Sequence, residues 1–353
     1  MKEYRRIGDL VDLIDERNKD EKVKTLIGVS IDKCFIKSVA NTIGTDLSKY
    51  QVIRKFDFAC SLMQVSRDGK IPIACLKDYD EAIMSPAYYI FRIKNTEEIL
   101  PDYMAMWFMR PEFDREASYI AVGGVRGSMP WEDFCDMKLP VPDIKEQQKI
   151  VDTYNAITNR IQIKQKINEN LEKTAQAIYR KMFIEDTDNL RKETLDSIYD
   201  FQYGKGNNNP DNGGKYPIYG SNGVIGGFNE YNNEDAPVVG HIGVACGSLL
   251  FAFGKHYVTY NGIMCNIKKS NIKYFGYWTM NYLNLRNEVR GSAQPFISYD
   301  LLNNLKFNYS TEQQKIEFDK KVTSIMDLIN VTQRELFILN KMKTLIISQI
   351  SKR

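Results

Sequence analysis

Apolar residues recur at alternating four- and three-residue steps over two long stretches of this chain, with polar residues between them. The first series is Ile150, Tyr154, Ile157, Ile161, Leu171, Ala175, Ile178 and Met182. The second series is Phe318, Val322, Ile325, Ile329, Leu336, Leu339, Ile346 and Ile350. Such spacing, sustained over about five heptads, is typical of a coiled-coil seam. The pattern predicts two long helices, within 143–188 and 310–353, each roughly 60 Å long at about 1.5 Å per residue.

Neither helix can bury its apolar stripe alone, so we expect the two helices to pair. Antiparallel pairing would place the domains that precede them at opposite ends, related by a pseudo-twofold axis. The predicted interface consists of Ile150, Ile157, Ile161, Leu171, Ile178, Val322, Ile325, Ile329, Leu336, Leu339 and Ile346. The seam is interrupted by Lys164, Asn168, Thr332 and Lys343. These polar residues are either tolerated locally or control the pairing register, since a buried polar residue penalises slipped pairings.

Both predicted helices have start signals. The segment Leu139-Pro140-Val141-Pro142 closes the preceding domain, because proline disfavours continued regular structure. Asp143 can then cap the first helix, and Glu146 three residues later completes a capping-box pattern. Ser310 or Thr311 would begin the second helix in the same way.

The two halves of the chain share short segments in the same order. In chain order the pairs are Ile93-Lys94 with Ile267-Lys268, Tyr103 and Trp107 with Tyr274 and Trp278, Val125–Ser128 with Val289–Ser292, and Glu146–Ile150 with Glu312–Ile316. One shared pentapeptide could be chance, but four ordered matches indicate a tandem duplication. Each copy is then a globular domain followed by a long helix.

The globular parts combine strand-like runs with helical segments. Alternating runs at Val23–Ser30, Phe56–Val65 and Tyr88–Ile93 predict strands, and Tyr103–Met109 is a predicted helix. The second part is rich in glycine and asparagine, which favour turns. We therefore expect an α+β fold with globular domains at 1–142 and 189–309, separated by the helices at 143–188 and 310–353.

The loop-rich segments carry the candidate nucleic-acid contacts. These are Arg67, Arg126, Lys205, Asn207, Asn208, Asn222 and Arg290. Asparagine can pair with adenine, and arginine or lysine can bind guanine or phosphate. For each residue alone, a turn-forming role or a solvated surface charge is the competing interpretation. Arg126 and Arg290 occupy equivalent places in the two copies, which a shared structural loop would also explain.

Composition narrows the class of protein only slightly. The 353 residues, 43% of them hydrophobic and 26% charged, suit two soluble domains with connecting helices. The net charge of +3 permits a nucleic-acid partner without arguing for one. No apolar run approaches the roughly 18 residues of a membrane span, and the charged N-terminus lacks a signal core. We expect a cytoplasmic protein that does not contact a membrane.

The sequence contains no motif for catalysis, cofactor binding or metal binding. Its six cysteines lack clustered spacing and are interpreted as small buried hydrophobic residues rather than metal ligands. There is no GxxxxGK[ST] loop and no GxSxG elbow, and Asp211 breaks a [DN]PP[YF] match at Asn209-Pro210. We therefore expect no catalytic centre, no metal and no cofactor in this chain.

These features resemble the specificity subunits of type I restriction-modification systems. The most specific of them are Leu139–Pro142 running into Glu146–Ile150, and the heptad helix that ends near Met182-Phe183. Tyr216–Gly223 also resembles a recurrent segment of the family's recognition domain. The second copy departs from the pattern, because Phe307-Asn308-Tyr309 replaces the proline-rich segment before the helix.

The resemblance implies a non-catalytic subunit for phage defence. Two target recognition domains would each read one half of a bipartite site in double-stranded DNA, and the helices would set the gap between the halves. Two modification subunits, which bind S-adenosylmethionine and methylate adenine, would dock on this subunit, and restriction subunits could join them. Two alternatives stay open: a DNA reader for another defence or modification assembly, and a coiled-coil scaffold that binds proteins without DNA.

Overall fold

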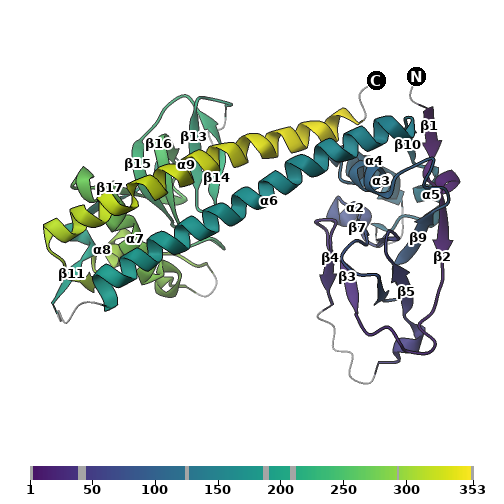
Figure 1. The fold of residues 1–353 in the computed structure, drawn as a ribbon, viewed down its shortest axis with the longest axis horizontal. Helices are drawn as coiled ribbons and strands as arrows, with labels where there is room; N and C mark the ends of the chain where they lie inside the picture. The colour runs from purple at the N-terminus through teal and green to yellow at the C-terminus, as the bar shows by residue number, and fades with distance from the viewer. Residues whose placement is uncertain are drawn as a thin grey trace. The chain divides into compact units, whose positions relative to one another are not determined.

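The computed structural model describes residues 3–38, 45–123, 127–185, 191–206, 212–291 and 294–350. The chain forms two compact units (Figure 1). Unit 1 comprises Met1–Gln162 and Phe337–Arg353, and unit 2 comprises Ile163–Leu336. The long helices α6 (Ile144–Arg180) and α9 (Glu312–Gln349) each contribute to both units. A globular part and segments of both helices therefore make up each unit.

Unit 1 is built on an antiparallel sheet in the order β2-β9-β6-β7. Its strands are β2 (Val11–Ile14), β9 (Tyr89–Ile93), β6 (Phe58–Cys60) and β7 (Ile73–Cys75). Three further antiparallel pairs are β1 (Glu3–Arg6) with β10 (Lys138–Val141), β3 (Ile27–Val29) with β4 (Phe35–Lys37), and β5 (Gln51–Arg54) with β8 (Glu81–Met84). The short α-helices are α1 (Ile7–Leu10), α2 (Val65–Asp68), α3 (Pro101–Phe108), α4 (Pro111–Ile120) and α5 (Trp131–Asp136). Strands and helices are mixed, as the α+β prediction requires.

The core of unit 1 joins the sheet to the helices through aromatic side chains. Phe58 of β6 and Phe91 of β9 stack at 5.2 Å between ring centroids. The edge of Phe108, from α3, meets the Phe58 ring at 5.8 Å. Offset and edge-on ring contacts of this kind add to the stabilisation from burial alone. The predicted strand at Tyr88–Ile93 and helix at Tyr103–Met109 are confirmed as β9 and α3, but only Phe58–Cys60 of the predicted strand Phe56–Val65 is a strand, and Val65 begins α2.

Unit 2 has a six-stranded sheet in the order β12-β17-β15-β16-β13-β14. Its strands are β12 (Tyr199–Tyr203), β13 (Tyr216–Gly220), β14 (Gly223–Phe228), β15 (Asn233–Gly240), β16 (Leu249–Val258) and β17 (Gly262–Ile267). A separate pair joins β11 (Lys192–Thr194) to β18 (Lys306–Asn308). The α-helices of the globular part are α7 (Lys273–Leu283) and α8 (Tyr299–Asn303). The buried core includes Phe275 and Trp278 of α7.

The two units repeat one strand arrangement, which supports the predicted duplication. The order β2-β9-β6-β7 in unit 1 corresponds to β12-β17-β15-β16 in unit 2, where the β13–β14 hairpin is added at the edge. The matched lysines Lys94 and Lys268 follow equivalent strands. Each donates its backbone N–H at 2.9 Å, to Leu10 and to Ile198 respectively. Trp107 and Trp278 are likewise both buried in the equivalent helices α3 and α7.

The predicted cap residues Asp143 and Thr311 are confirmed, but they reveal a shift in the repeat. The Asp143 carboxylate accepts the N–H of Lys145 at 3.1 Å and of Glu146 at 3.0 Å. Helix α6 starts at Ile144, directly after Asp143. At α9, the Thr311 hydroxyl accepts the Gln314 backbone N–H at 3.2 Å, while the Gln314 side-chain oxygen Oε1 accepts the Thr311 backbone N–H at 2.9 Å. Glu146 therefore stands three residues after its cap, whereas Glu312 directly follows its own. The repeated pentapeptide is displaced by two residues between the two helices.

The long helices run antiparallel within each unit. In unit 2, Tyr179 of α6 meets Phe318 of α9 at 5.7 Å between ring centroids, and the earlier Lys164 pairs with the later Glu335 at 2.5 Å. In unit 1, the Lys343 ammonium lies 5.3 Å from the centre of the Tyr154 ring. α6 ends in a single π-helical turn at Lys181–Glu185. None of the helices among the described residues is long and apolar enough to cross a membrane.

The predicted seam residues are all removed from solvent to some degree. Ile157, Ile161, Val322, Ile329 and Leu339 are buried. The half-buried residues are Ile150, Leu171, Ile178, Ile325, Leu336 and Ile346. Among the polar interruptions, Lys164 and Lys343 make the contacts given above. Asn168 and Thr332 each bury a side-chain oxygen that accepts or donates no hydrogen bond.

Candidate nucleic-acid interface

Hydrogen bonds join five loops of unit 2 into one surface, here called the loop face of unit 2. The loops are Gly204–Gly206, Ser221–Asn222, His241–Ser248, Thr259–Asn261, and the segment formed by Arg290–Gly291 and Gln294–Ile297. The Lys205 N–H bonds to the Val258 carbonyl at 3.0 Å, and the Thr259 N–H bonds to the Tyr219 carbonyl at 3.0 Å. Because backbone groups make these contacts, the loops are held in place while their side chains remain available.

Two glycines allow the close approach of these loops. A Cβ atom on Gly204 would lie 2.1 Å from the Thr259 carbonyl oxygen. A Cβ atom on Gly240 would lie 2.5 Å from the Ala245 oxygen and 2.8 Å from the Ser221 oxygen. Since these are backbone atoms, no side-chain movement could relieve the clash. The glycine-rich composition of this half is therefore partly a packing requirement.

Four aromatic rings form the floor of the loop face. Tyr203 lies 4.4 Å from His241, 5.7 Å from Tyr260 and 4.9 Å from Tyr299 between ring centroids. Tyr260 and Tyr299 remain 39% and 36% exposed. The His241 Nδ1 atom lies 2.7 Å from the Ile297 carbonyl oxygen, which ties this floor to the last loop. Exposed tyrosines beside lysine and arginine give a surface that can meet both a phosphate and a base edge.

The structure brings the described candidates of the second half onto this one surface. Lys205, Asn222 and Arg290 all expose their side chains. Arg290 exchanges two backbone hydrogen bonds with Phe296, at 2.9 and 2.8 Å, and lines a hollow with Glu288, Ser298 and Asp300. Asn207 and Asn208 lie outside the described residues, next to the Gly204–Gly206 loop. No sequence pattern indicated that Tyr260 and Tyr299 would accompany these candidates, because their ring partner Tyr203 is distant in sequence.

Unit 1 has a corresponding surface, the loop face of unit 1, formed by Ser61–Lys70 and Gly127–Pro130. The Met129 N–H bonds to the Leu62 carbonyl at 2.9 Å, as the Ile297 N–H bonds to the His241 carbonyl at 3.0 Å in unit 2. A Cβ atom on Gly127 would meet Ser66 Oγ at 2.3 Å, so this segment lies directly against α2. Arg67 of α2 therefore lies near the segment that follows Arg126, which is itself outside the described residues.

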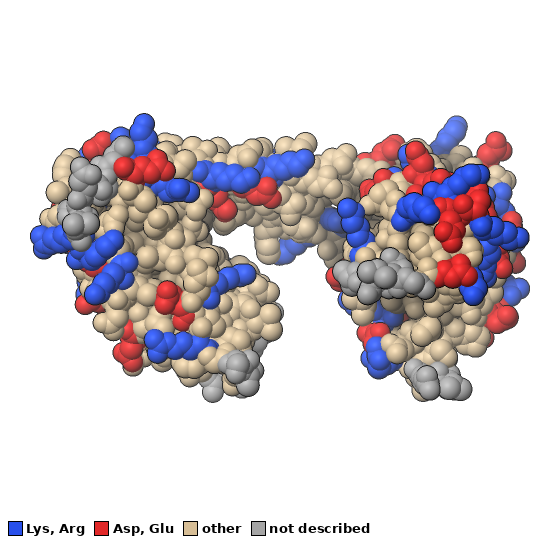
Figure 2. Space-filling view, turned by 90° about the horizontal axis from the view of Figure 1, so that it is seen from below, with Lys and Arg blue, Asp and Glu red and all other residues tan. Residues whose placement is uncertain are grey.

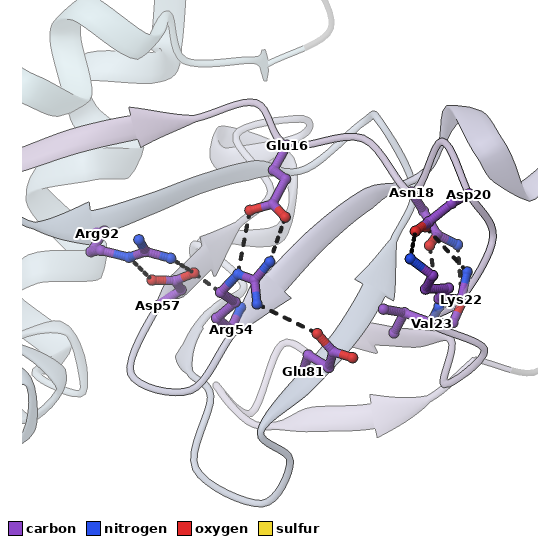
Figure 3. Close-up of polar contacts among 9 residues, drawn as sticks. All are labelled: Glu16, Asn18, Asp20, Lys22, Val23, Arg54, Asp57, Glu81 and Arg92. Carbon is purple, nitrogen blue, oxygen red and sulfur yellow. Dashed lines mark hydrogen bonds and ion pairs between the residues drawn. The ribbon is translucent and has the colours of Figure 1, made fainter.

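The exposed arginines of unit 1 are restrained by carboxylates. Arg67 pairs with Asp68 at 2.8 Å. Figure 3 shows that Arg92 of β9 donates two hydrogen bonds to the Asp57 carboxylate, at 2.6 and 2.8 Å. Arg54 in turn pairs with Glu16 at 2.5 Å and with Glu81 at 3.5 Å. The hydrogen bond to Asp57 raises the pKa of Arg92, and the hydrogen bond to Glu16 raises the pKa of Arg54, so each carboxylate stabilises the charged form of its arginine.

Charge is distributed over both units rather than concentrated. In the view of Figure 2, lysine, arginine and acidic side chains are scattered over the described surface, and this face carries no continuous basic patch. This agrees with the small net charge of +3. A DNA contact on this face would therefore depend on individually placed cations more than on a broad positive field.

The residues that could carry out chemistry are buried or dispersed. Among the described residues, no group of three or more histidine, cysteine, aspartate or glutamate side chains could hold a metal ion. Burial raises the pKa of the Cys75 thiol to about 12 and raises those of Cys60 and Cys265 further, so these thiols are poor nucleophiles. Cys246 is also buried, but Cys34 is exposed. The interpretation of all six cysteines as buried was wrong for Cys34, which lies in the β3–β4 hairpin turn, and Cys75 and Cys135 are only half-buried.

Comparison with known proteins decides the family of the first half. Residues 2–173 match the family model of the type I restriction modification DNA specificity domain. The chain carries a type I restriction-modification DNA specificity domain. This confirms the resemblance predicted from the sequence. The matched region contains all of the globular part of unit 1, including its loop face, and most of α6.

Relatives of the specificity domain have low identity to this chain. The type I restriction enzyme MjaVIII specificity subunit of Methanocaldococcus jannaschii is 29% identical over 153 residues, which are 42% of this chain and 36% of that protein. The HindI specificity subunit of Haemophilus influenzae is 24% identical over 110 residues, 31% of this chain and 24% of that protein. The aligned part thus spans about a third or less of either relative.

The fold likeness extends beyond the matched specificity domain. The crystal structure of a type I restriction-modification S subunit from M. genitalium aligns with 99% of this chain and 96% of its own, with a TM-score of 0.64 and 17% identity. At that identity the alignment shows the fold alone. Unit 2 therefore shares the specificity-subunit fold although the family model covers only residues 2–173.

Proposed function

We propose that this chain is the DNA specificity subunit of a type I restriction-modification enzyme. Each unit would read one half of a bipartite duplex site, and the chain itself would have no catalytic role. The observation that carries the proposal is the loop face that recurs at equivalent strands in both units, each beside at least one predicted cation. Linking two such readers raises both affinity and specificity when the connection matches the DNA spacing.

The proposed DNA contacts divide by unit. Arg67 and Arg126 would contact the half-site of unit 1. Lys205, Asn207, Asn208, Asn222 and Arg290 would contact that of unit 2. Exposed cations would bind phosphates and position each unit, while asparagine and arginine would contribute base readout. In this proposal the recognition domains are residues 1–142 and 189–309, and the spacer helices are residues 143–188 and 310–353.

The partners are also part of the proposal. Two modification subunits would dock on the chain, bind S-adenosylmethionine and methylate adenine, and restriction subunits could join them in the cytoplasm. The paired helices would set the gap between half-sites. The relatives named as type I specificity subunits support this assignment.

The deciding experiment is a methylation map. The chain would be co-expressed with the modification subunit encoded beside it, and methylated adenines would be mapped genome-wide. A motif with two short specific halves and a fixed gap is the expected result. Replacing residues 193–308 by those of a relative should then change one half only. A stable complex without methylation would favour another effector, and a complex that binds no DNA would favour a protein scaffold.

The role of the helices has its own test. Seven residues would be inserted between Gln162 and Ile163 of α6, and seven more between Leu336 and Phe337 of α9, so that the seam is extended on both sides. Seven residues add about 10 Å of helix, which equals about three base pairs. We expect both half-sites to stay the same while the gap changes. An unchanged gap would remove the helices from the proposal.

A further inference from the structure

One side chain on the loop face of unit 2 has no structural use. Val244 is fully exposed, at 106% of its reference area, in the loop between β15 and β16. A branched apolar side chain in water gains nothing from the fold, since burial is what makes such residues stabilising. The conformation of the loop does not depend on a valine at this position, because backbone hydrogen bonds and glycines determine it.

The backbone around Val244 is firmly held. Gly243 donates its N–H to the Pro295 carbonyl at 3.0 Å, and Cys246 donates to the Gly243 carbonyl at 2.9 Å. Gly247 closes the loop by donating to Gly240 at 2.9 Å. Gly243 and Gly247 adopt left-handed conformations, with φ of 83° and 75°. The side chain is thus presented from a fixed loop, which lowers the entropy cost of a contact.

The corresponding position in unit 1 is used differently. Leu62 and His241 are equivalent because each accepts the N–H of the second loop, from Met129 and Ile297. Three residues later stand Val65 and Val244, each after a left-handed residue, Gln64 or Gly243. Val65 is fully buried in the core of unit 1. The same place in the duplicated fold therefore holds a core residue in one unit and an exposed one in the other.

The surroundings of Val244 favour DNA over another partner. The Ile242 and Phe296 backbones form a β-bridge, and Phe296, 41% exposed, also bridges to the exposed cation Arg290. The exposed Val244 side chain therefore stands near Arg290, to which the proposed function assigns a DNA contact, and near the tyrosine floor. On a duplex, the exposed apolar group that such a tip can meet is the 5-methyl group of thymine in the major groove.

We propose that Val244 contacts the 5-methyl group of a thymine in the half-site read by unit 2, and so helps to specify that base pair. This inference rests on the proposed function. It adds a base-specificity residue that acts through apolar contact rather than through a hydrogen bond. Loss of one buried methyl group is expected to weaken binding about fourfold.

The test removes the methyl group from the DNA. Full-length chain would be titrated against duplexes that carry the mapped motif, with each thymine of the second half-site replaced in turn by deoxyuridine. Binding of the unmodified duplex by the wild-type chain tests the proposed function separately. Val244→Ala is the probe variant. Val331→Ala is the matched control, because Val331 is 52% exposed on α9, outside the loop face.

The expected result is one position at which deoxyuridine weakens binding about fourfold for the wild type and the Val331→Ala chain but not for Val244→Ala. The proposal is overturned if that half-site contains no A·T pair, or if every deoxyuridine effect persists in Val244→Ala. It is also overturned if Val244→Ala binds all duplexes as the wild type does but loses the modification subunit on co-purification. That outcome would make the tip a protein contact. Thermal unfolding would verify that both variants are folded.

Discussion

In both unit 1 and unit 2, a side chain of a long helix accepts backbone N–H groups at the start of a core helix, but the chemistry of the accepting group differs. In unit 1, the Gln147 side chain of α6 accepts the Leu100 N–H at the start of α3, at 2.9 Å. In unit 2, the Asp319 carboxylate of α9 accepts the N–H groups of Tyr274 and Phe275 at the start of α7, at 3.0 and 2.7 Å. The two contacts lie at different positions of the repeat, since the caps at Asp143 and Thr311 align Gln147 with Lys315. Unit 1 therefore uses a neutral amide and unit 2 uses an acid one turn further along the long helix.

The loop faces of the two units also differ in their chemistry. On its loop face, unit 1 carries Arg67, which pairs with the neighbouring Asp68 carboxylate at 2.8 Å. Unit 2 instead fixes glycine-rich loops by backbone bonds over a floor of tyrosines. A common strand order thus carries two chemically unlike surfaces. Two readers that diverge only in their loops can recognise unrelated half-sites without any change in the framework that connects them.

The largest expected effect comes from forcing the chemistry of unit 2 onto unit 1. In Gln147→Glu, a buried carboxylate would face the Glu98 and Pro142 carbonyls, which now accept from Nε2 at 2.8 Å each. We expect a loss of about 3 kcal/mol or more in the free energy of unfolding. Urea unfolding measures it. The control Gln313→Glu, exposed in the repeated pentapeptide, should change stability by less than about 0.5 kcal/mol. Equal small effects would mean that the amide contacts are not important.

The acid of unit 2 should make its stability depend on pH. Burial raises the pKa of Asp319 from 3.8 to about 6, although the hydrogen bonds from Tyr274 and Phe275 oppose the shift. Between these two values the folded chain keeps a proton that the unfolded chain has released. The free energy of unfolding should therefore fall as the pH rises from about 4 to 6, by about 2–3 kcal/mol relative to Asp319→Asn.

Urea unfolding of the wild type and Asp319→Asn at pH 4, 5, 6 and 7 would measure this difference, and hydrogen exchange in α7 would locate it. Unit 1 attaches α3 through an amide, so amides of α3 should show no matching change. A difference between the two proteins that stays constant with pH would show that Asp319 is ionised throughout this range.

The loop faces predict unequal contributions from their cations. Lys205→Gln and Arg290→Gln should each weaken DNA binding about fivefold and reduce the salt slope by about one, as expected for lost phosphate contacts. Arg67→Gln should have a smaller effect, because Asp68 already offsets the charge of Arg67. Fluorescence titrations at several salt concentrations measure both quantities. A larger loss for Arg67→Gln would indicate that DNA displaces Asp68.

The smallest effect concerns the helix seam. The Thr332 hydroxyl is buried at 1% exposure and makes no hydrogen bond. Thr332→Val keeps the shape and should stabilise unit 2 by about 1 kcal/mol, raising the melting temperature. Thr158→Val in unit 1 should gain less, because Thr158 is only half-buried. A melting temperature that falls in Thr332→Val would mean that the hydroxyl has a stabilising partner, such as a bound water.

The long helices and their caps could be predicted from sequence because local signals specify them. The apolar steps from Ile150 to Ile350 and the cap at Asp143 depend on neighbouring residues only. The duplication was also visible, although the shifted pentapeptide shows that a matched motif need not hold matched structural positions. Gln147 is buried and Gln313, its partner in the motif, is exposed.

The loop faces were harder to predict, because distant segments assemble them. Lys205 and Arg290 are 85 positions apart, and their shared surface depends on contacts such as that of Gly243 with Pro295. No periodicity indicates that Tyr203 would meet both Tyr260 and Tyr299. Val244 was missed for the same reason, since an exposed valine cannot be told from a buried one such as Val65 by sequence spacing.

The strand pair β11–β18 has a consequence for how the chain folds. Lys192 lies opposite Asn308, and the Asn308 amide donates to the Phe183 carbonyl at 2.9 Å, so the chain leaves α6 and returns to α9 at one point. Topologically, the globular part of unit 2 is an insertion at the turn of a helical hairpin. The entropy lost in bringing together the ends of this long inserted segment is little more than for a short loop, because loop-closure entropy grows only with the logarithm of length. The hairpin can therefore accept large changes in what it carries at its turn without losing its own pairing.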